Sequence, residues 1–301
     1  MDRDSRELKF TVPWGHVAAK AWGSPEKKRV LAVHGTLDNA GSFTNLCKLL
    51  PDKYFIVAID LPGHGFSTHF PRGMNLDFFN YVYAIKYVLD ELEWNKCLYI
   101  GHSFGGQLGT VFSIIYPERL EKMISLDAIL PRSISNDELL IRIKEVSEIT
   151  FSHNNSKEEK AYSKEAILNA LKTRRYFSLN DSAIEALFER AVTKVGDDLY
   201  KYNRDIRMRI FLVPNLNRDQ YAELMKYAQT PTLIILATNS WFNMTEKLES
   251  DLKFCKKIMP HHYVISVVNG NHDVHNNNPE RIVSMIVDFF ENDSTNIKSK
   301  L

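Results

Sequence analysis

Short, almost continuously apolar runs recur along the chain and alternate with longer segments of helical spacing. The runs lie at residues 29–33, 54–59, 97–100, 123–126, 232–236 and 263–268. They are rich in Val and Ile without polar alternation, which is typical of strands buried on both faces. Between them, segments such as 75–91, 104–116 and 279–290 repeat apolar residues every three or four positions, which predicts helices. This alternation of strands and helices predicts an α/β fold with a mostly parallel central sheet and helices on both faces.

The pattern changes near the N-terminus, where two short apolar-rich segments stand close together. Residues 8–12 and 16–22 flank the turn sequence Pro13-Trp14-Gly15. Two such segments separated by a Pro- and Gly-containing turn predict a hairpin. We therefore expect the sheet to open with antiparallel strands.

The strand rhythm stops between about residues 131 and 229 and resumes at Thr232. Charged helical segments at 137–147, 162–175 and 182–195 fill this stretch, and no buried strand is expected there. A helical insertion lying over one end of the sheet as a cap is the simplest interpretation. The predicted units are the first part of the α/β core (1–130), the helical cap (131–229), the second part of the core (230–292) and a tail (293–301).

Composition excludes several classes of partner. The chain has 38 basic and 37 acidic residues and a net charge of +1, so no broad field favours nucleic acid. No apolar run approaches the roughly 20 residues of a membrane span, and residues 1–9 have no apolar signal core. Cys47, Cys97 and Cys255 have no disulfide or metal spacing, so reduced structural thiols are expected. No nucleotide-binding motif opens a helix, and we expect neither a cofactor nor a metal.

The last three residues are Ser299, Lys300 and Leu301. A terminal Ser-Lys-Leu is recognised by the peroxisomal import receptor as an address rather than an anchor. The polar stretch before it suits an exposed tail. The expected location is therefore peroxisomal, and otherwise cytoplasmic.

The sequence GHSFGG at 101–106 carries the strongest chemical signal. It follows the strand expected at 97–100 and precedes the helix expected at 104–116. A G-x-S-x-G sequence in this position indicates a nucleophile elbow, a sharp turn that exposes a serine above the sheet. Ser103 is therefore the candidate nucleophile, and the glycines two positions away on either side must lack side chains because the turn is crowded.

When the nucleophile stands at such an elbow, the catalytic base comes last along the chain and is expected after the final strand. The sequence there is GNHDVH, residues 270–275. His272 directly follows the Gly-Asn turn and is the preferred base, while His275 is the alternative.

The acid of the triad is less obvious, because the loop at 237–241 after the strand 232–236 has no carboxylate and the nearest acid is Glu246. Asp127 directly follows the run 123–126, and from that strand tip it can reach a histidine on a neighbouring strand. Asp127 is the candidate acid, although an Asp here can also cap a turn.

An oxyanion hole needs two backbone N–H groups, one from the residue after the nucleophile and one from the loop after strand 29–33. Phe104 and Thr36 hold these positions, and Gly35 lets the loop turn inward. We interpret His34 as structural, because the late histidine already fills the base role. The turn at 60–67 (DLPGHGFS) is interpreted as architecture, with Asp60 and His64 hydrogen-bonded.

Taken together, these residues resemble the serine hydrolase-like (kraken-like) family of the α/β-hydrolase superfamily. The matching pieces are 12–16 (VPWGH), 18–23 (AAKAWG), 34–35 (HG) with 37–40 (LDNA) and 42–43 (SF), 101–106, 203–205 (NRD), and 270–272 with 274–275. The resemblance implies an α/β-hydrolase fold, a triad of Ser103, Asp127 and His272, and peroxisomal association. Thr36 stands where a Trp is usual after His-Gly, so the family's substrate preference is not transferred. Related dehalogenases and epoxide hydrolases need an Asp nucleophile, which Ser103 does not supply.

Two functions remain open from the sequence. The first is a serine hydrolase that acts on a small acyl ester or an acyl-CoA-like thioester through an acyl-enzyme, with Arg174, Arg175 or Arg204 as candidates for recognising CoA. The second is a non-catalytic small-molecule binder or sensor on a hydrolase scaffold. Labelling of Ser103 by a fluorophosphonate distinguishes them.

Overall fold

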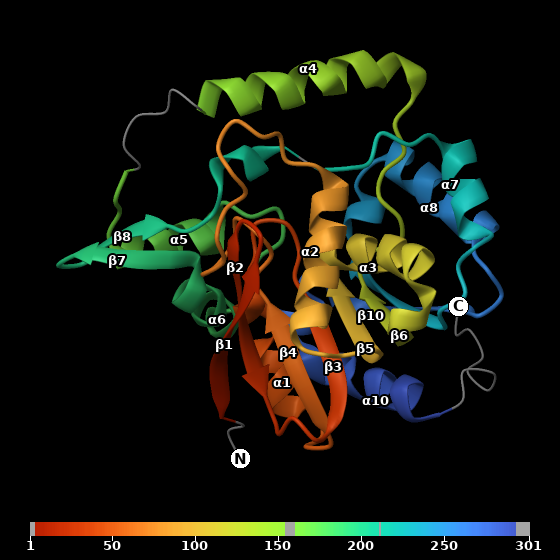
Figure 1. The fold of residues 1–301 in the computed structure, drawn as a ribbon, viewed down its shortest axis with the longest axis horizontal. Helices are drawn as coiled ribbons and strands as arrows, with labels where there is room; N and C mark the ends of the chain where they lie inside the picture. Colours follow the sequence, from red (N-terminus) through yellow and green to blue (C-terminus); the bar gives the residue numbers. More distant parts are fainter. Residues whose placement is uncertain (1–3, 154–159, 211, 293–301) are drawn as a thin grey trace.

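A computed structural model of the protein describes residues 4–153, 160–210 and 212–292. Eight strands form one sheet in the order β1-β2-β4-β3-β5-β6-β9-β10 (Figure 1). Their bounds are β1 Ser5–Val12, β2 Gly15–Trp22, β3 Lys28–Val33, β4 Tyr54–Ile59, β5 Cys97–His102, β6 Leu120–Leu126, β9 Thr232–Asn239 and β10 Tyr263–Asn271. Strand β2 runs antiparallel to β1 and β4, and the other neighbouring pairs are parallel. The predicted hairpin and the mostly parallel sheet are both confirmed.

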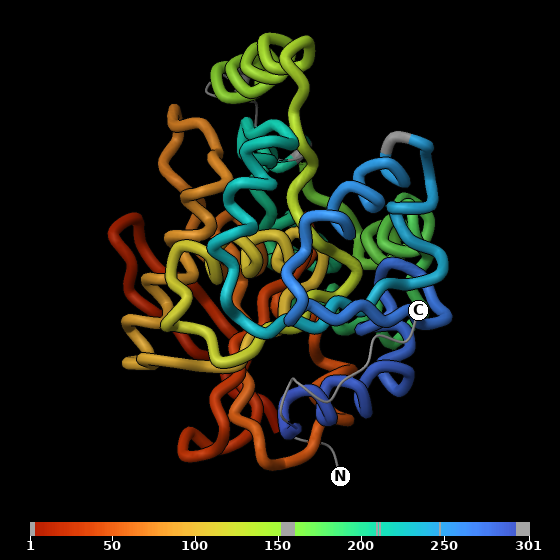
Figure 2. Tube along the Cα trace, turned by 90° about the vertical axis from the view of Figure 1, so that its right-hand side faces the viewer, coloured from red at the N-terminus to blue at the C-terminus, as the bar shows by residue number. Residues whose placement is uncertain are grey.

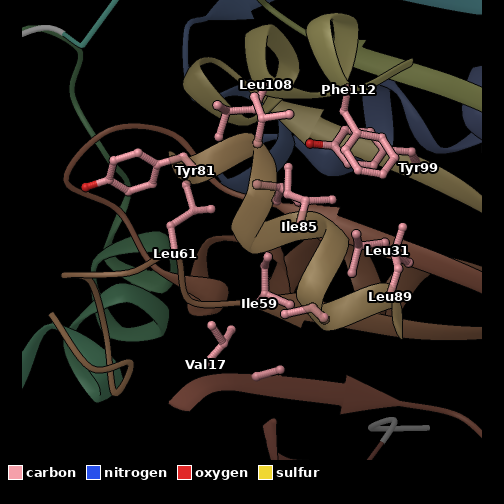
Figure 3. Packing of buried hydrophobic residues seen from close by; sticks show 14 of the residues in the cluster. Val17, Leu31, Ile59, Leu61, Tyr81, Ile85, Leu89, Tyr99, Leu108 and Phe112 are labelled. Carbon is pink, nitrogen blue, oxygen red and sulfur yellow. The ribbon is translucent and has the colours of Figure 1, made fainter. Parts of the chain in front are cut away.

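Helices cover both faces of this sheet. Strand β4 shows why, because its six consecutive apolar residues are all buried and point alternately to two cores. Phe55, Val57 and Ile59 pack with helices α2 (Phe78–Glu91) and α3 (Phe104–Ile115), as Figure 3 shows in part. The intervening residues face α1 (Thr44–Leu49) and α10 (Val283–Glu291). A strand without polar alternation is therefore buried on both sides, as its sequence predicted.

A third cluster covers the far end of the sheet. Residues of β9 and β10 pack there against α7 (Arg218–Met225) and α8 (Glu246–Ile258). The buried thiol of Cys255 belongs to this cluster, and Cys47 and Cys97 are likewise buried and not disulfide-bonded. The three cysteines therefore act as packing residues.

Two predicted helices begin later than their apolar pattern suggested. Helix α2 begins at Phe78 because the side chain of Asp77 accepts the N–H of Phe79 at 2.8 Å and caps the helix. Pro279 opens a 3₁₀ turn, Pro279–Arg281, and α10 begins only at Val283.

The segment predicted as a helical cap contains helices α4 (Asn136–His153), α5 (Lys164–Thr173) and α6 (Asp181–Ala191). It also contains a hairpin of β7 (Val192–Gly196) and β8 (Leu199–Tyr202), which the sequence analysis missed. The helix expected to reach residue 195 ends at 191, because the β-branched residues that follow pair with β8. Figures 1 and 2 show α4 as the outermost element at the top of the molecule. The boundaries at 131 and 229 stay a prediction.

None of the helices in the described ranges is both long and apolar enough to cross a membrane. The Ser-Lys-Leu terminus lies in 293–301, outside the described residues.

Candidate active site

Ser103 stands at the turn between β5 and α3 with a backbone that few residues adopt. Its φ is 49° and its ψ is −114°, which is outside the ordinary regions for an L-residue. Its N–H donates to the carbonyl oxygen of Leu126 at 2.9 Å, and its own carbonyl accepts the N–H of Gln107 at 3.1 Å. The turn is therefore strained and held from both sides, as expected for a nucleophile elbow.

The two glycines of the elbow are required by close backbone contacts. A Cβ on Gly101 would lie 2.4 Å from the carbonyl oxygen of Gly105. A Cβ on Gly105 would lie 2.0 Å from the carbonyl oxygen of Val33 in β3. Since both obstacles are backbone, a side chain at either position would force the strand, the turn and the helix apart.

Asp127 and His272 meet in the structure. Nδ1 of His272 lies 2.6 Å from Oδ2 of Asp127, and both side chains are buried. Asp127 also accepts the N–H of Ala237 at 2.9 Å and the hydroxyl of Ser240 at 2.7 Å. These two donors fix the orientation of the carboxylate toward His272. With Nδ1 turned to Asp127, Nε2 is the ring nitrogen left for proton transfer.

The strand order corrects one detail of the sequence argument. Asp127 was expected to reach a histidine on a neighbouring strand, but the neighbours of β6 are β5 and β9. His272 follows β10, one strand further away, and its loop returns over the end of β9 to meet Asp127. The contacts from Ala237 and Ser240 of the β9 end show where this crossing occurs.

His275, the alternative base, faces another way. Its ring centroid lies 3.9 Å from that of His102 and 5.4 Å from that of Phe43. It is fully buried, and among the described residues neither ring nitrogen has a hydrogen-bond partner. Burial, followed by the neighbouring His102, holds the pKa of His275 well below its ordinary value. The structure thus brings His272, and not His275, to Asp127.

The loop after β3 approaches the nucleophile closely. A Cβ on Gly35 would lie 3.0 Å from Cβ of Ser103, so the backbone beside Thr36 runs next to the serine. Phe104, on the other side of the serine, is buried and packs edge-on against Phe78. The two candidate oxyanion donors therefore belong to backbone segments that flank Ser103.

Buried polar side chains hold this loop, as the sequence analysis expected for His34, Asp60 and His64. Nδ1 of His34 contacts the carbonyl oxygen of Gly35 at 2.7 Å, and Nε2 accepts the N–H of Leu61 at 3.0 Å. His64 accepts the N–H of Leu37, and Asp60 accepts the N–H of Ala40. Burial lowers the pKa of His34 to about 4 and that of His64 to about 3, so both rings are neutral structural acceptors.

Aromatic side chains surround the imidazole of His272. The ring centroid of Phe177 lies 5.4 Å from it, and that of Trp241 lies 6.0 Å from it. Tyr176 packs edge-on against Trp241 at 4.7 Å. The sequence analysis did not single out Phe177. The chain after α5 thus supplies part of the wall around the candidate base.

A second buried polar cluster lies beside Asp127 and His272. Arg175 donates to Asp38 at 2.8 Å and to Asp273 at 3.1 Å, and these carboxylates lie near His102. One ligand atom from each of Asp38, His102 and Asp273 lies within 4.8 Å of the others, which is the spacing of a metal site. The guanidinium already supplies a positive charge there. Arg175 is therefore engaged with two carboxylates and is not a free group for CoA.

Comparison with known proteins agrees with this architecture. The sequence model described as the alpha/beta hydrolase fold matches residues 28–279. A serine hydrolase-like protein from Danio rerio is 33% identical over 295 residues, covering 97% of this chain and 90% of the relative. Serine hydrolase-like protein 2 from Homo sapiens is 35% identical over 297 residues, covering 95% of this chain and 94% of the relative.

Solved structures share the fold at lower identity. A hypothetical protein from Pseudomonas aeruginosa superposes with a TM-score of 0.84 at 23% identity, covering 95% of this chain and 99% of that one. The thioesterase domain from the curacin biosynthetic pathway superposes with a TM-score of 0.81 at 23% identity, covering 94% and 99%. These solved structures share the fold of the chain. The match to the sequence model and the similarity to the two serine hydrolase-like relatives show that the protein is a member of the serine hydrolase-like family within the α/β-hydrolase fold.

Proposed function

We propose that this chain hydrolyses a carboxylic ester or thioester through a triad of Ser103, His272 and Asp127 and an acyl-enzyme intermediate. The observation that carries the proposal is the pairing of Asp127 with Nδ1 of His272 at 2.6 Å, beside a serine held in a strained strand-to-helix turn. An imidazole oriented by a carboxylate is the kind of base that makes an exposed serine hydroxyl nucleophilic.

The chemistry follows from the positions of the groups. Nε2 of His272 takes the proton of the Ser103 hydroxyl as Oγ attacks the acyl carbonyl carbon. The negative charge on the carbonyl oxygen is stabilised by the backbone N–H groups of Thr36 and Phe104. His272 then returns the proton to the leaving alcohol or thiol, and water attacks the acyl-enzyme by the same route to release the acid. Asp127 holds the imidazole tautomer and stabilises the imidazolium.

A fluorophosphonate probe tests the nucleophile, because it reacts covalently only with an activated serine. Wild type is expected to label, and Ser103→Ala is expected to lose labelling while remaining folded. Ser250→Ala, a change on the surface of α8, is the matched control and is expected to label like wild type. Equal labelling of wild type and Ser103→Ala would refute the proposal. A folded wild type that fails to label would instead favour the binder or sensor.

Substrate class is tested with p-nitrophenyl acyl esters and acyl-CoA thioesters of graded length. Ester hydrolysis lost in Ser103→Ala supports the activity, and a preference for acyl-CoA over its pantetheine analogue would indicate recognition of the nucleotide part. With Arg175 engaged, the exposed Arg174 and Arg204 are the remaining basic candidates for that recognition.

We also propose that the protein is imported into peroxisomes through Ser299, Lys300 and Leu301, since this tripeptide is the address that the import receptor binds. The full chain, tagged at its N-terminus, is expected in peroxisomes, and the same chain without Leu301 is expected in the cytosol. An unchanged distribution would contradict the assignment.

A further inference from the structure

Arg175 joins three segments that are far apart in the sequence. It follows α5, and its Nη1 donates to Oδ1 of Asp38 at 2.8 Å, in the loop after β3 and 137 residues away. Its Nη2 donates to Oδ1 of Asp273 at 3.1 Å, in the loop after β10 and 98 residues away. One planar guanidinium therefore bridges two loops that enter the site from different strands.

Each of these loops carries a group that the proposed reaction needs. Asp38 lies two residues after Thr36, the proposed oxyanion donor. Asp273 directly follows His272, the proposed base. We infer that Arg175 is a positioning residue of this active site, which sets the spacing between the oxyanion loop and the base loop. This inference rests on the proposed function.

The carboxylates of Asp38 and Asp273 need the guanidinium between them because both are buried. The side chains of Asp38 and Asp273 are 1% and 3% exposed, and Arg175 is 21% exposed. Burial by itself would raise the pKa of Asp38, but Arg175, followed by His102, holds it below its ordinary value. Two buried carboxylates with no cation between them would repel each other and lose their solvation. Without Arg175, a carboxylate must take up a proton or a loop must move outward toward water, and either change alters the contacts that hold the two loops.

His102 contacts one of these loops and lies close to the other. Its Nε2 contacts the carbonyl oxygen of His272 at 3.0 Å, and its Nδ1 lies 3.7 Å from Oδ2 of Asp38. The carbonyl can only accept, so Nε2 carries the proton. Nδ1 then has no proton to donate to Asp38 and no hydrogen-bond partner among the described residues, so His102 holds the backbone of His272 and only lies near Asp38.

The chain around Arg175 also contacts the base directly. Phe177, two residues later, lies with its ring centroid 5.4 Å from that of His272. Release of Arg175 would therefore loosen the aromatic wall as well as the two loops. Lysine cannot replace it fully, because a single ammonium lacks the planar fork that reaches two carboxylates at once.

Kinetics of p-nitrophenyl acetate hydrolysis test the inference. Arg175→Met is expected to lower kcat about 10- to 100-fold with little change in KM, because a small displacement of reacting groups costs turnover rather than binding of a small ester. Arg175→Lys should recover part of the loss. Lys172→Met is the matched control, since Lys172 near the end of α5 pairs with Asp181 at the start of α6 on the exposed surface, and it should behave like wild type.

A double substitution separates positioning from general destabilisation. Arg175→Met with Asp273→Asn should be no less active than Arg175→Met alone, because the unpaired buried charge is removed together with its partner. Thermal unfolding of each variant identifies any that fails to fold, and Arg175→Lys then serves alone. A kcat within twofold of wild type, a raised KM at unchanged kcat, or an equal loss in Lys172→Met would overturn the inference.

A spectroscopic measurement keeps the test independent of activity. The proton between Nδ1 of His272 and Asp127 should give a far-downfield NMR signal in wild type and in Lys172→Met. In Arg175→Met this signal should broaden or disappear, because the imidazole is no longer held. An unchanged signal would refute the positioning role even if wild type proves inactive, an outcome that would refute the proposed function separately.

Discussion

Replacing Asp127 by Asn should reduce turnover far more than it reduces stability. The carboxylate has three partners, namely the N–H of Ala237 on Oδ1 and both the hydroxyl of Ser240 and Nδ1 of His272 on Oδ2. An amide keeps the shape of this group but offers one acceptor and one donor. The orientation of the amide therefore decides the tautomer of the histidine.

The N–H of Ala237 determines that orientation, because it needs an oxygen. The amide oxygen takes the place of Oδ1, and the NH₂ group then faces His272 and donates to Nδ1. The proton of the imidazole moves to Nε2, which can no longer accept the proton of Ser103. The opposite orientation leaves the buried N–H of Ala237 facing an NH₂ group, at a cost of about 1–3 kcal/mol.

The expected loss follows from these two effects. An orientation penalty of about 1–3 kcal/mol leaves roughly one molecule in 10 to 100 with the active tautomer, since about 1.4 kcal/mol is a factor of ten. Loss of the charge opposite the imidazolium weakens that hydrogen bond by about 1–3 kcal/mol more. Together these effects cost about 2–6 kcal/mol, so kcat should fall about 30- to 10⁴-fold, with KM nearly unchanged.

The assay is steady-state hydrolysis of a p-nitrophenyl ester by wild type and Asp127→Asn at equal folded concentration. Ser240→Ala is the matched control, because it removes one hydrogen bond to the same oxygen without changing the tautomer. It should cost about tenfold or less in kcat. If Asp127→Asn retains activity within threefold of wild type, Asp127 is not the acid of a triad.

Three further outcomes are expected from urea denaturation. Gly105→Ala should lower the free energy of unfolding by at least about 3 kcal/mol, because its Cβ would lie 2.0 Å from a carbonyl oxygen of β3; a change below 1 kcal/mol would contradict the crowding. Arg190→Met should lower the free energy of unfolding by about 3–5 kcal/mol, because it leaves the buried Asp60 without its forked partner at 2.7 Å. Partial recovery of stability in the double variant Arg190→Met with Asp60→Asn would support this reasoning, and no recovery would refute it. Stability should fall from pH 7 to pH 5, because burial lowers the folded pKa values of His34 and His102 to about 4. As the pH falls below about 6.5, these histidines become protonated in the unfolded chain but stay neutral in the folded one, which lowers the free energy of unfolding by about 2 kcal/mol for each ring. A flat or rising stability profile over this range would show that these histidines are charged in the fold.

Local sequence patterns predicted the strands, the hairpin and the elbow correctly, because each depends on neighbouring residues. The six apolar residues of β4 are buried on both faces wherever that strand lies in a sheet. The glycines around Ser103 are similarly local, since the sharp turn itself brings their backbones together. Helix ends were less predictable, because a capping contact such as that of Asp77 outweighs the apolar period.

The hairpin of β7 and β8 was missed because its strands are largely exposed and carry no apolar run. The chemistry around the triad was missed for a different reason. Asp38, Phe177 and Ser240 have no local signature, and their roles arise only when distant loops converge. Arg175, considered as a free basic residue, turned out to be paired with two buried carboxylates.

The sequence by itself determined the strand and helix alternation and the sharp turn at Ser103 between a strand and a helix. It could do so because the spacing of apolar residues and the crowding of a sharp turn act over a few residues. Only the tertiary structure decided that Asp127 reaches His272 across the end of β9, and that Arg175 ties the two loops together. Those contacts join residues about 100 or more positions apart, and a buried charge selects its partner by proximity in space.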